Sequence, residues 1–239
     1  MHRSREDAPA KLTRTLRIVG VRDDGLHLVD AEMVTVDLAD TLAFSEGDGL
    51  TLIGAAPDVP TDDANLVRRA LAAVGRAAQV ELTKRIPSGA GLGGGSADAA
   101  AVLRWAGVMD RDAASRLGAD VPFCLMGGRA RVTGVGEIVE ALPFEPLTFT
   151  LLTPPVHCST AEVYRAWGDL GGPTADSTND LEPAALVVAP ELARWRDHLG
   201  EATGQTPMLA GSGSTWFVEG HFPGEGRVVV RSLPAFAHA

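Results

Sequence analysis

A run of glycines near the middle of the chain carries the clearest chemical signal. Residues 87–96 follow an alternating, strand-like pattern at residues 80–84, and an alanine-rich helical pattern begins at residue 96. A glycine-rich turn lets successive backbone N–H groups point at one anion, and the N-terminus of the next helix adds partial positive charge. We therefore interpret the segment as a phosphate-binding loop, which consists of Pro87, Ser88, Gly89, Ala90, Gly91, Leu92, Gly93, Gly94, Gly95 and Ser96.

Three other interpretations of this loop are weaker. A Walker A loop would end in Gly-Lys-Ser/Thr, which is missing here. Gly89, Gly91 and Gly94 fit the G-x-G-x-x-G fingerprint of dinucleotide-binding proteins, but no convincing second strand precedes Asp110 and Asp112, where the ribose-binding acid would lie. A merely flexible surface loop rarely sits between a strand and an alanine-rich helix with proline at its start.

Four further polar residues are candidates for chemistry, and each also has an ordinary structural explanation. Asp120 could be a turn or cap aspartate, and Lys11 could be a solvated lysine near the start of a strand. His27 follows a turn, where histidine is often only a surface residue. Ser96 could cap the helix that follows the glycine loop. Residue types and spacing alone leave these alternatives open.

The element pattern indicates a mixed α and β protein. A short segment with a proline at each end, residues 143–146, predicts a boundary between two domains, 1–146 and 147–239. In the first we expect strands at residues 16–21, 28–44 and 80–84, and two more within 129–142, with helices at 65–77 (capped by Asp62 or Asp63) and 112–117. In the second we expect strands at 149–152, within 208–218 and at 227–233, with helices at 160–167 and within 181–199.

Composition excludes several classes of function. The chain has 239 residues, 45% of them hydrophobic, and a formal net charge of -10, so we expect no nucleic-acid partner. Its two cysteines, Cys124 and Cys158, have no metal-binding spacing. No apolar stretch has the length of a signal core or a bilayer span, so the sequence predicts a cytoplasmic protein without a membrane partner.

Beyond the glycine loop, several motifs along the chain resemble one family in the same order. The loop is similar to the ATP-phosphate loop of GHMP kinases, and its Gly-Leu-Gly-Gly-Gly-Ser most resembles the 4-diphosphocytidyl-2-C-methyl-D-erythritol kinases among them. The other matching segments are Pro9-Ala10-Lys11, Arg22-Asp23-Asp24-Gly25-Leu26-His27, Gly118-Ala119-Asp120-Val121-Pro122-Phe123, Ser159-Thr160-Ala161-Glu162-Val163-Tyr164, Asn179-Asp180-Leu181-Glu182 and Gly211-Ser212-Gly213-Ser214-Thr215.

The resemblance implies an α+β fold with a ribosomal-S5-like N-terminal domain and a ferredoxin-like C-terminal domain. It implies an ATP- and Mg²⁺-dependent kinase of non-mevalonate isoprenoid synthesis that phosphorylates the 2-hydroxyl of a cytidine diphosphate-linked methylerythritol, as a monomer or homodimer. By position, Asp120 would be the catalytic base, Lys11 its partner, and Ser96 a contact of Mg²⁺ or the β-phosphate. The acceptor would be bound by Thr13, His27, Gly211 and Ser212.

The sequence departs from the family mainly where the acceptor would bind. The family's tyrosine before histidine is Leu26, its asparagine after the lysine is Thr13, and Ser177-Thr178 stand where a bulky residue often precedes Asn-Asp. The loss of one stacking ring could weaken cytosine binding by ~1–3 kcal/mol. Two alternatives therefore stay open: a related kinase with a different small alcohol as acceptor, and a nucleotide-binding module without catalysis.

Overall fold

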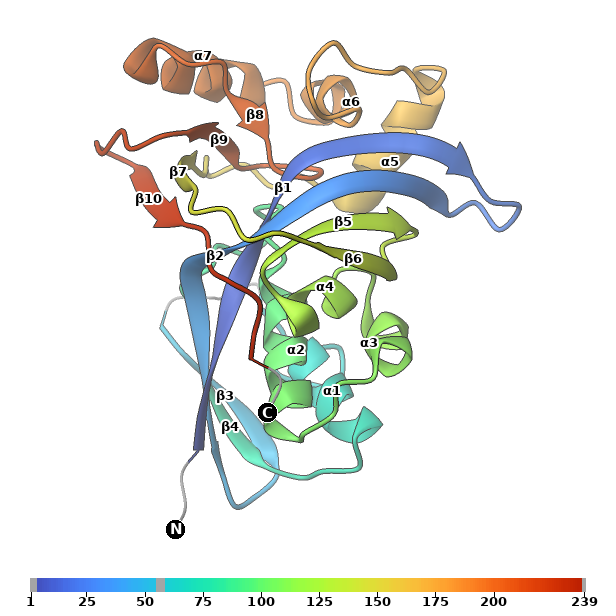
Figure 1. Cartoon of the computed structure of the whole chain (residues 1–239), viewed down its shortest axis with the longest axis vertical. Coiled ribbons are helices and arrows are strands. Elements are labelled where there is room, and N and C mark those ends of the chain that lie inside the picture. Colours follow the sequence, from blue (N-terminus) through green and yellow to red (C-terminus); the bar gives the residue numbers. More distant parts are fainter. Residues whose placement is uncertain (1–3, 55–58, 238–239) are drawn as a thin grey trace.

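The computed structural model describes residues 4–54 and 59–237, which form two β-sheets with helices against each (Figure 1). The larger sheet has the order β3-β4-β2-β5-β6, with β1 paired to β2. All of its pairs are antiparallel except β3 with β4. Its strands are β1 (Ser4–Val21), β2 (His27–Ser45), β3 (Gly49–Ile53), β4 (Gln79–Thr83), β5 (Arg129–Gly134) and β6 (Ile138–Leu142).

The hairpin of β1 and β2 is the longest feature of the fold. The turn that joins them closes where Gly25, at φ 84°, donates its N–H to the carbonyl of Arg22, as the sequence predicts. Strand β1 begins at Ser4 rather than at residue 16, because its polar first half pairs with β2 as far as Phe44. A register shift between Pro9 and Lys11 interrupts this pairing, and such irregularities re-aim nearby side chains.

Four helices of the first half lie beside the larger sheet (Figure 1): α1 (Leu66–Ala73), α2 (Gly94–Trp105), α3 (Arg111–Leu117) and α4 (Val121–Met126). The buried alanines of α2 let its backbone lie close to β1 and β2. The expectation that Asp62 or Asp63 caps α1 is wrong, since the side chain of Asn65 accepts the N–H of Val67. Helix α4 follows Asp120 directly and was not expected from the sequence.

The second sheet has the order β10-β7-β9-β8 and is antiparallel throughout. The expected helical stretch at residues 181–199 is two helices, because the residue before Pro190 leaves helical geometry. An α+β fold is therefore confirmed. The elements of this half are β7 (Thr148–Leu152), α5 (Thr160–Asp169), α6 (Glu182–Val188), α7 (Leu192–Thr203), β8 (Met208–Leu209), β9 (Trp216–Glu219) and β10 (Arg227–Arg231).

Two hydrophobic cores hold the molecule together, and both cross the middle of the chain. The larger core joins the first sheet and its helices, but it also contains Phe149 and Phe217 from the second sheet. The smaller core lies with α5 to α7, and it contains Leu16 from β1. The expected domain boundary, between residues 146 and 147, falls between β6 and β7. It separates the two sheets, but both hydrophobic cores contain residues from either side of it.

Across the ranges that the structure describes, no helix is both long enough and apolar enough to cross a lipid bilayer.

Candidate active site

A cavity of about 960 Å³ is lined by residues from both halves of the chain. Its walls come from β1, the glycine loop, the start of α2, the segment before α4, helix α5 and the loop between β8 and β9. All the residues that were expected to bind ATP, Mg²⁺ or the acceptor, or to take part in catalysis, line this one cavity. They are Lys11, Thr13, His27, the ten residues of the loop from Pro87 to Ser96, Asp120, Gly211 and Ser212.

The glycine loop depends on backbone geometry that favours glycine. Gly89, Gly91 and Gly93 have φ values of 68°, 75° and 68°, in the left-handed region. Gly93 is also the N-cap of α2, so the loop runs directly into a helix N-terminus, where unpaired N–H groups attract anions. Ser96 lies in the first turn of α2 and does not cap it, and the described residues give its hydroxyl no hydrogen bond.

The second half of the chain clamps the loop at Gly91. A Cβ atom at Gly91 would lie 2.2 Å from the carbonyl oxygen of Ala210 and 2.7 Å from that of Gly213. On either side of Gly91, Ala90 accepts the N–H of Thr215 at 3.2 Å, and Leu92 accepts the backbone N–H of Lys11 at 3.1 Å. The loop is therefore fixed against both β1 and the segment between β8 and β9.

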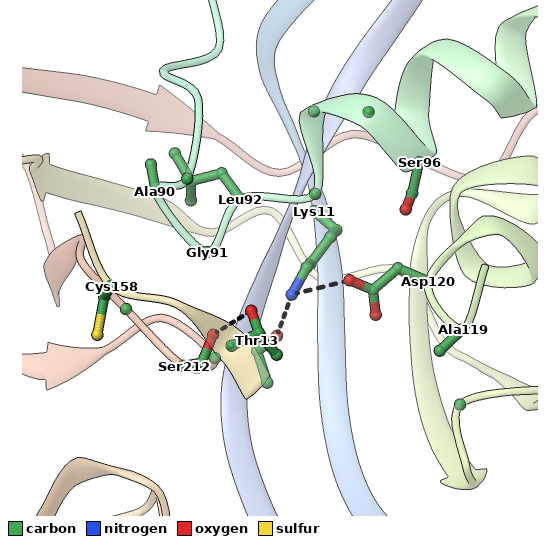
Figure 2. A pocket seen from close by; sticks show the side chains of 18 of the residues that line it. Lys11, Thr13, Ala90, Gly91, Leu92, Ser96, Ala119, Asp120, Cys158 and Ser212 are labelled. Carbon is green, nitrogen blue, oxygen red and sulfur yellow. Dashed lines mark hydrogen bonds and ion pairs between the residues drawn. The ribbon is translucent and has the colours of Figure 1, made fainter. Parts of the chain in front are cut away.

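Lys11 and Asp120 form an ion pair beside the glycine loop (Figure 2). The Nζ atom of Lys11 lies 3.3 Å from an oxygen of Asp120 and donates a hydrogen bond to Thr13 at 3.1 Å. The lysine side chain is 7% exposed and that of the aspartate 31%, so the carboxylate remains accessible from the cavity. Gly93 allows this placement, because a Cβ there would lie 2.7 Å from Cγ of Lys11.

The remaining polar residues of the expected acceptor side lie next to this pair. A Cβ atom at Gly211 would lie 3.4 Å from Nζ of Lys11, so the loop between β8 and β9 closes against the lysine. The hydroxyl of Ser212 is hydrogen-bonded to that of Thr160 at 2.9 Å, which ties the same loop to α5. Asn179 holds the loop from outside by donating to the carbonyls of Leu209 and Gly211. Asn179 therefore has a structural role at this site.

His27 lines the cavity within an aromatic cluster. Its ring centroid lies 4.7 Å from that of Tyr164 and 5.4 Å from that of Trp167, both on α5. Partial burial lowers the pKa of His27 below its usual 6.5, so its imidazole is neutral at pH 7 and offers one donor and one acceptor. Burial, and then the charge of Asp120, raise the pKa of Tyr164 to about 12.

Several functional candidates were missed by sequence reasoning. Tyr164 lay within a recognised motif but was given no role, and Arg165 beside it lines the cavity too. Lys84 and Asp98 line the cavity as well, and Lys84 is held between Asp98 and the buried Asp40. The alternation around Lys84 indicated only a strand. Nothing in the sequence could show that Asp40, Lys84 and Asp98, which come from three separate segments, lie in contact.

Comparisons with known proteins agree with one another. Residues 65–128 match the family described as "GHMP kinases N terminal domain". The chain is 38% identical over 241 residues to 4-diphosphocytidyl-2-C-methyl-D-erythritol kinase of Cereibacter sphaeroides, a match that covers 88% of this chain and 87% of that protein. It is 40% identical over 250 residues to the protein of the same name from Pelotomaculum thermopropionicum, with 88% and 86% covered.

Solved structures give the same result. A crystal structure of 4-(cytidine 5'-diphospho)-2C-methyl-D-erythritol kinase superposes with a TM-score of 0.75 at 30% identity, over 96% of this chain and 99% of that one. A mevalonate kinase structure shares the fold at 13% identity, with a TM-score of 0.62 over 97% and 99% of the two chains. From its sequence identity, its coverage and its two-sheet fold, this chain belongs to the 4-diphosphocytidyl-2-C-methyl-D-erythritol kinase family of GHMP kinases.

Proposed function

We propose that this protein transfers the γ-phosphoryl group of ATP to the 2-hydroxyl of 4-diphosphocytidyl-2-C-methylerythritol, a step of non-mevalonate isoprenoid synthesis. The observation that carries the proposal is the Lys11–Asp120 ion pair, which lies next to the glycine loop within one cavity. Phosphoryl transfer needs held phosphates, a neutralising charge and an aligned hydroxyl, and these groups supply all three. The acceptor is inferred from the names of the relatives.

In this reaction the oxygen of the acceptor hydroxyl attacks the γ-phosphorus of ATP. The bond from that phosphorus to the bridging oxygen of the β-phosphate breaks, and ADP leaves with the electron pair. Asp120 receives the proton of the attacking hydroxyl. Lys11 orients this carboxylate across 3.3 Å and stabilises negative charge on the phosphoryl group as it transfers.

The donor set of the cavity fits Mg²⁺ that is held mostly by phosphate. Within residues 4–54 and 59–237, no three His, Cys, Asp or Glu side chains form a metal-binding group. Mg²⁺ usually keeps several waters and binds nucleotide phosphates with only one or two protein oxygens. The hydroxyl of Ser96, which lies in the first turn of α2 and lines the cavity, is suited to be such a ligand. The ion would neutralise phosphate charge during transfer.

The part of the cavity around His27 and Tyr164 suits a base joined to a diphosphate. The neutral imidazole of His27 can pair with the polar edge of cytosine, and Tyr164 offers an aromatic ring beside it. Three Lys or Arg side chains line the cavity in the described ranges. Lys11 and Lys84 are each paired with carboxylates, whereas those ranges offer Arg165 no ion pair, so Arg165 is the cation available to the acceptor diphosphate.

A second acceptor class is favoured by the residue at position 26. Leu26 lines the cavity and is 49% exposed, so no ring stacks there. Ser177 and Thr178, where the sequence also departs from the family, do not line the cavity and direct their hydroxyls to backbone carbonyls. A small alcohol without a base would need no ring at position 26. Leu26→Tyr separates the two classes, because it lowers KM for a cytidine-bearing acceptor by about tenfold and leaves that of a simple alcohol unchanged. Leu26→Met is its control.

The direct test is ADP release with and without 4-diphosphocytidyl-2-C-methylerythritol, for the natural protein and for Asp120→Asn. We expect turnover that depends on the acceptor and that falls about 10²–10⁴-fold in the variant, with ATP still bound. ATP binding without turnover on this acceptor or on other alcohols would instead favour a non-catalytic module. Equal turnover by Asp120→Asn would remove Asp120 from the proposed mechanism.

A further inference from the structure

A buried ion triad lies under the glycine loop and takes no part in the mechanism above. Lys84, directly after β4, is 8% exposed at its side chain. Its Nζ donates to Asp98 of α2 at 2.8 Å and also to Asp40 of β2, and these aspartates are 4% and 0% exposed. Burying three charges is costly unless they are paired and hydrogen-bonded, so their arrangement must be closely determined.

One end of the triad holds the beginning of the glycine loop. The second oxygen of Asp40 accepts the backbone N–H of Arg85 at 2.5 Å and that of Ile86 at 2.8 Å. These two residues lead from β4 into Pro87. The carboxylate of Asp40 therefore fixes the path of the backbone just before the loop, on the central strand of the larger sheet.

The other end holds the helix that the loop enters. Asp98 lies one turn into α2, and its carboxylate is bonded to the same lysine. Nζ of Lys84 also lies 3.3 Å from where a Cβ atom of Gly94, the first residue of α2, would be. The triad thus ties the segment before the loop to the helix after it. Without that tie, the glycines between would have wide conformational freedom.

We infer that Asp40, Lys84 and Asp98 are positioning residues, which fix the two ends of the glycine loop so that its N–H groups converge on the phosphates of ATP. The inference rests on the proposed binding of ATP at this loop. None of the three needs to touch the nucleotide for this role. Misplacement of catalytic or binding groups by about an ångström can reduce rates by up to 10²-fold, which makes such anchoring worth its desolvation cost.

The charge balance predicts which replacements are tolerated. The triad holds two carboxylates for one ammonium, and one oxygen of Asp98 is buried without a hydrogen bond among the described residues. Burial raises the pKa of Asp98 to about 7; Lys84 opposes this rise and Asp40 adds to it. A neutral asparagine at this position keeps an oxygen for Lys84 and removes the surplus charge, whereas alanine breaks the tie.

The test measures ATP binding by calorimetry and steady-state KM and kcat for ATP and for the acceptor. We expect Asp98→Ala to raise the Kd and KM of ATP by about tenfold or more, with a much smaller change in the acceptor KM. Asp98→Asn should restore ATP affinity to within about threefold of the natural protein. Both oxygens of Asp40 accept hydrogen bonds, so Asp40→Asn keeps an oxygen for the backbone N–H groups but turns an NH2 toward Nζ of Lys84. It should therefore weaken ATP binding several-fold, and it tests the inference if Asp98→Ala does not fold.

Asp180→Ala is the matched control for a purely structural effect. Asp180 is also buried, pairs with Arg17 at 2.7 Å and accepts backbone N–H groups, but it does not line the cavity. Its loss should lower the melting temperature and leave the Kd of ATP near the natural value. If Asp98→Ala and Asp180→Ala change ATP binding equally, or if the acceptor KM rises as much as that of ATP, the positioning role is wrong. If the natural protein itself does not bind ATP, the proposed function fails first.

Discussion

The ring of Tyr164 lies 4.7 Å from the imidazole of His27, centroid to centroid, and is tilted by 45°. The two residues come from different halves of the chain, one at the start of β2 and the other on α5. Their contact places an aromatic surface where Leu26 offers none. This part of the cavity, where we propose that the acceptor binds, is therefore built from both halves of the chain, and α5 supplies its aromatic ring.

Two substitutions of Tyr164 should distinguish the contribution of its aromatic ring to acceptor binding from that of its hydroxyl. Tyr164→Leu removes the aromatic surface beside His27, and we expect the acceptor KM to rise about fivefold to a hundredfold, as for the loss of one base-stacking contact. Tyr164→Phe keeps the ring and should stay within about threefold of the natural protein. Steady-state kinetics with varied acceptor at saturating ATP measures both. A larger loss in Tyr164→Phe than in Tyr164→Leu would assign the effect to the hydroxyl.

The pH dependence of acceptor binding should report on His27. Burial lowers its pKa below 6.5, so the neutral form is present at pH 7 and above and is lost only as the pH falls through this lowered value. A protonated imidazole cannot accept a hydrogen bond, so we expect the acceptor KM to be flat above pH 6.5 and to rise below it. The KM of His27→Asn should lack this rise, measured in the same buffers.

Arg165 should affect the acceptor and not ATP. Among the cations that line the cavity, Arg165 is the one for which the described residues offer no ion pair. We expect Arg165→Met to raise the acceptor KM about tenfold, in keeping with the loss of a charged hydrogen bond. High salt should reduce the difference between the two proteins. Arg194→Met on α7 is the control, because Arg194 lies outside the cavity and over Trp195. Equal changes in both variants would contradict a specific role.

Gly91→Ala should disturb the loop far more than an ordinary left-handed glycine would. Its new Cβ would lie 2.2 Å from the carbonyl oxygen of Ala210, besides the strain of φ 75°. Gly107 has a similar φ of 73° but no neighbour within 4 Å, so Gly107→Ala isolates the strain, about 1–2 kcal/mol. We expect only Gly91→Ala to lose ATP binding, with the larger fall in melting temperature. Equal effects would mean that the close approach relaxes easily.

The stability of Asp98→Asn relative to the natural protein should depend on pH. The folded pKa of Asp98 is raised to about 7 from 3.8, so the stability that its protonated form contributes is lost as the pH rises through that range. Asparagine does not ionise. The melting temperature of Asp98→Asn minus that of the natural protein should therefore increase from pH 5 to pH 8. A difference that is constant across this range would mean that Lys84 keeps Asp98 ionised throughout.

The sequence alone predicted the glycine loop, the family and most of the helices and strands, although it missed β3 and α4. Glycines followed by an alanine-rich helix restrict the local backbone whatever surrounds them, and the alternation at residues 28–44 and 80–84 is equally local. Lys11 and Asp120 were paired only through the family resemblance. The N-terminal half of β1 was missed because its polar residues become a strand only by pairing with β2.

Only the tertiary structure decided which side chains meet. The clamp of Gly91 by Ala210, the contact of Tyr164 with His27 and the bonding of Lys84 to two aspartates each join distant segments. No local propensity encodes such contacts, because they arise when the sheets and helices bury their apolar faces together. The physical reason is that sequence patterns fix which face of an element is buried, while the packing of the elements fixes what that face touches.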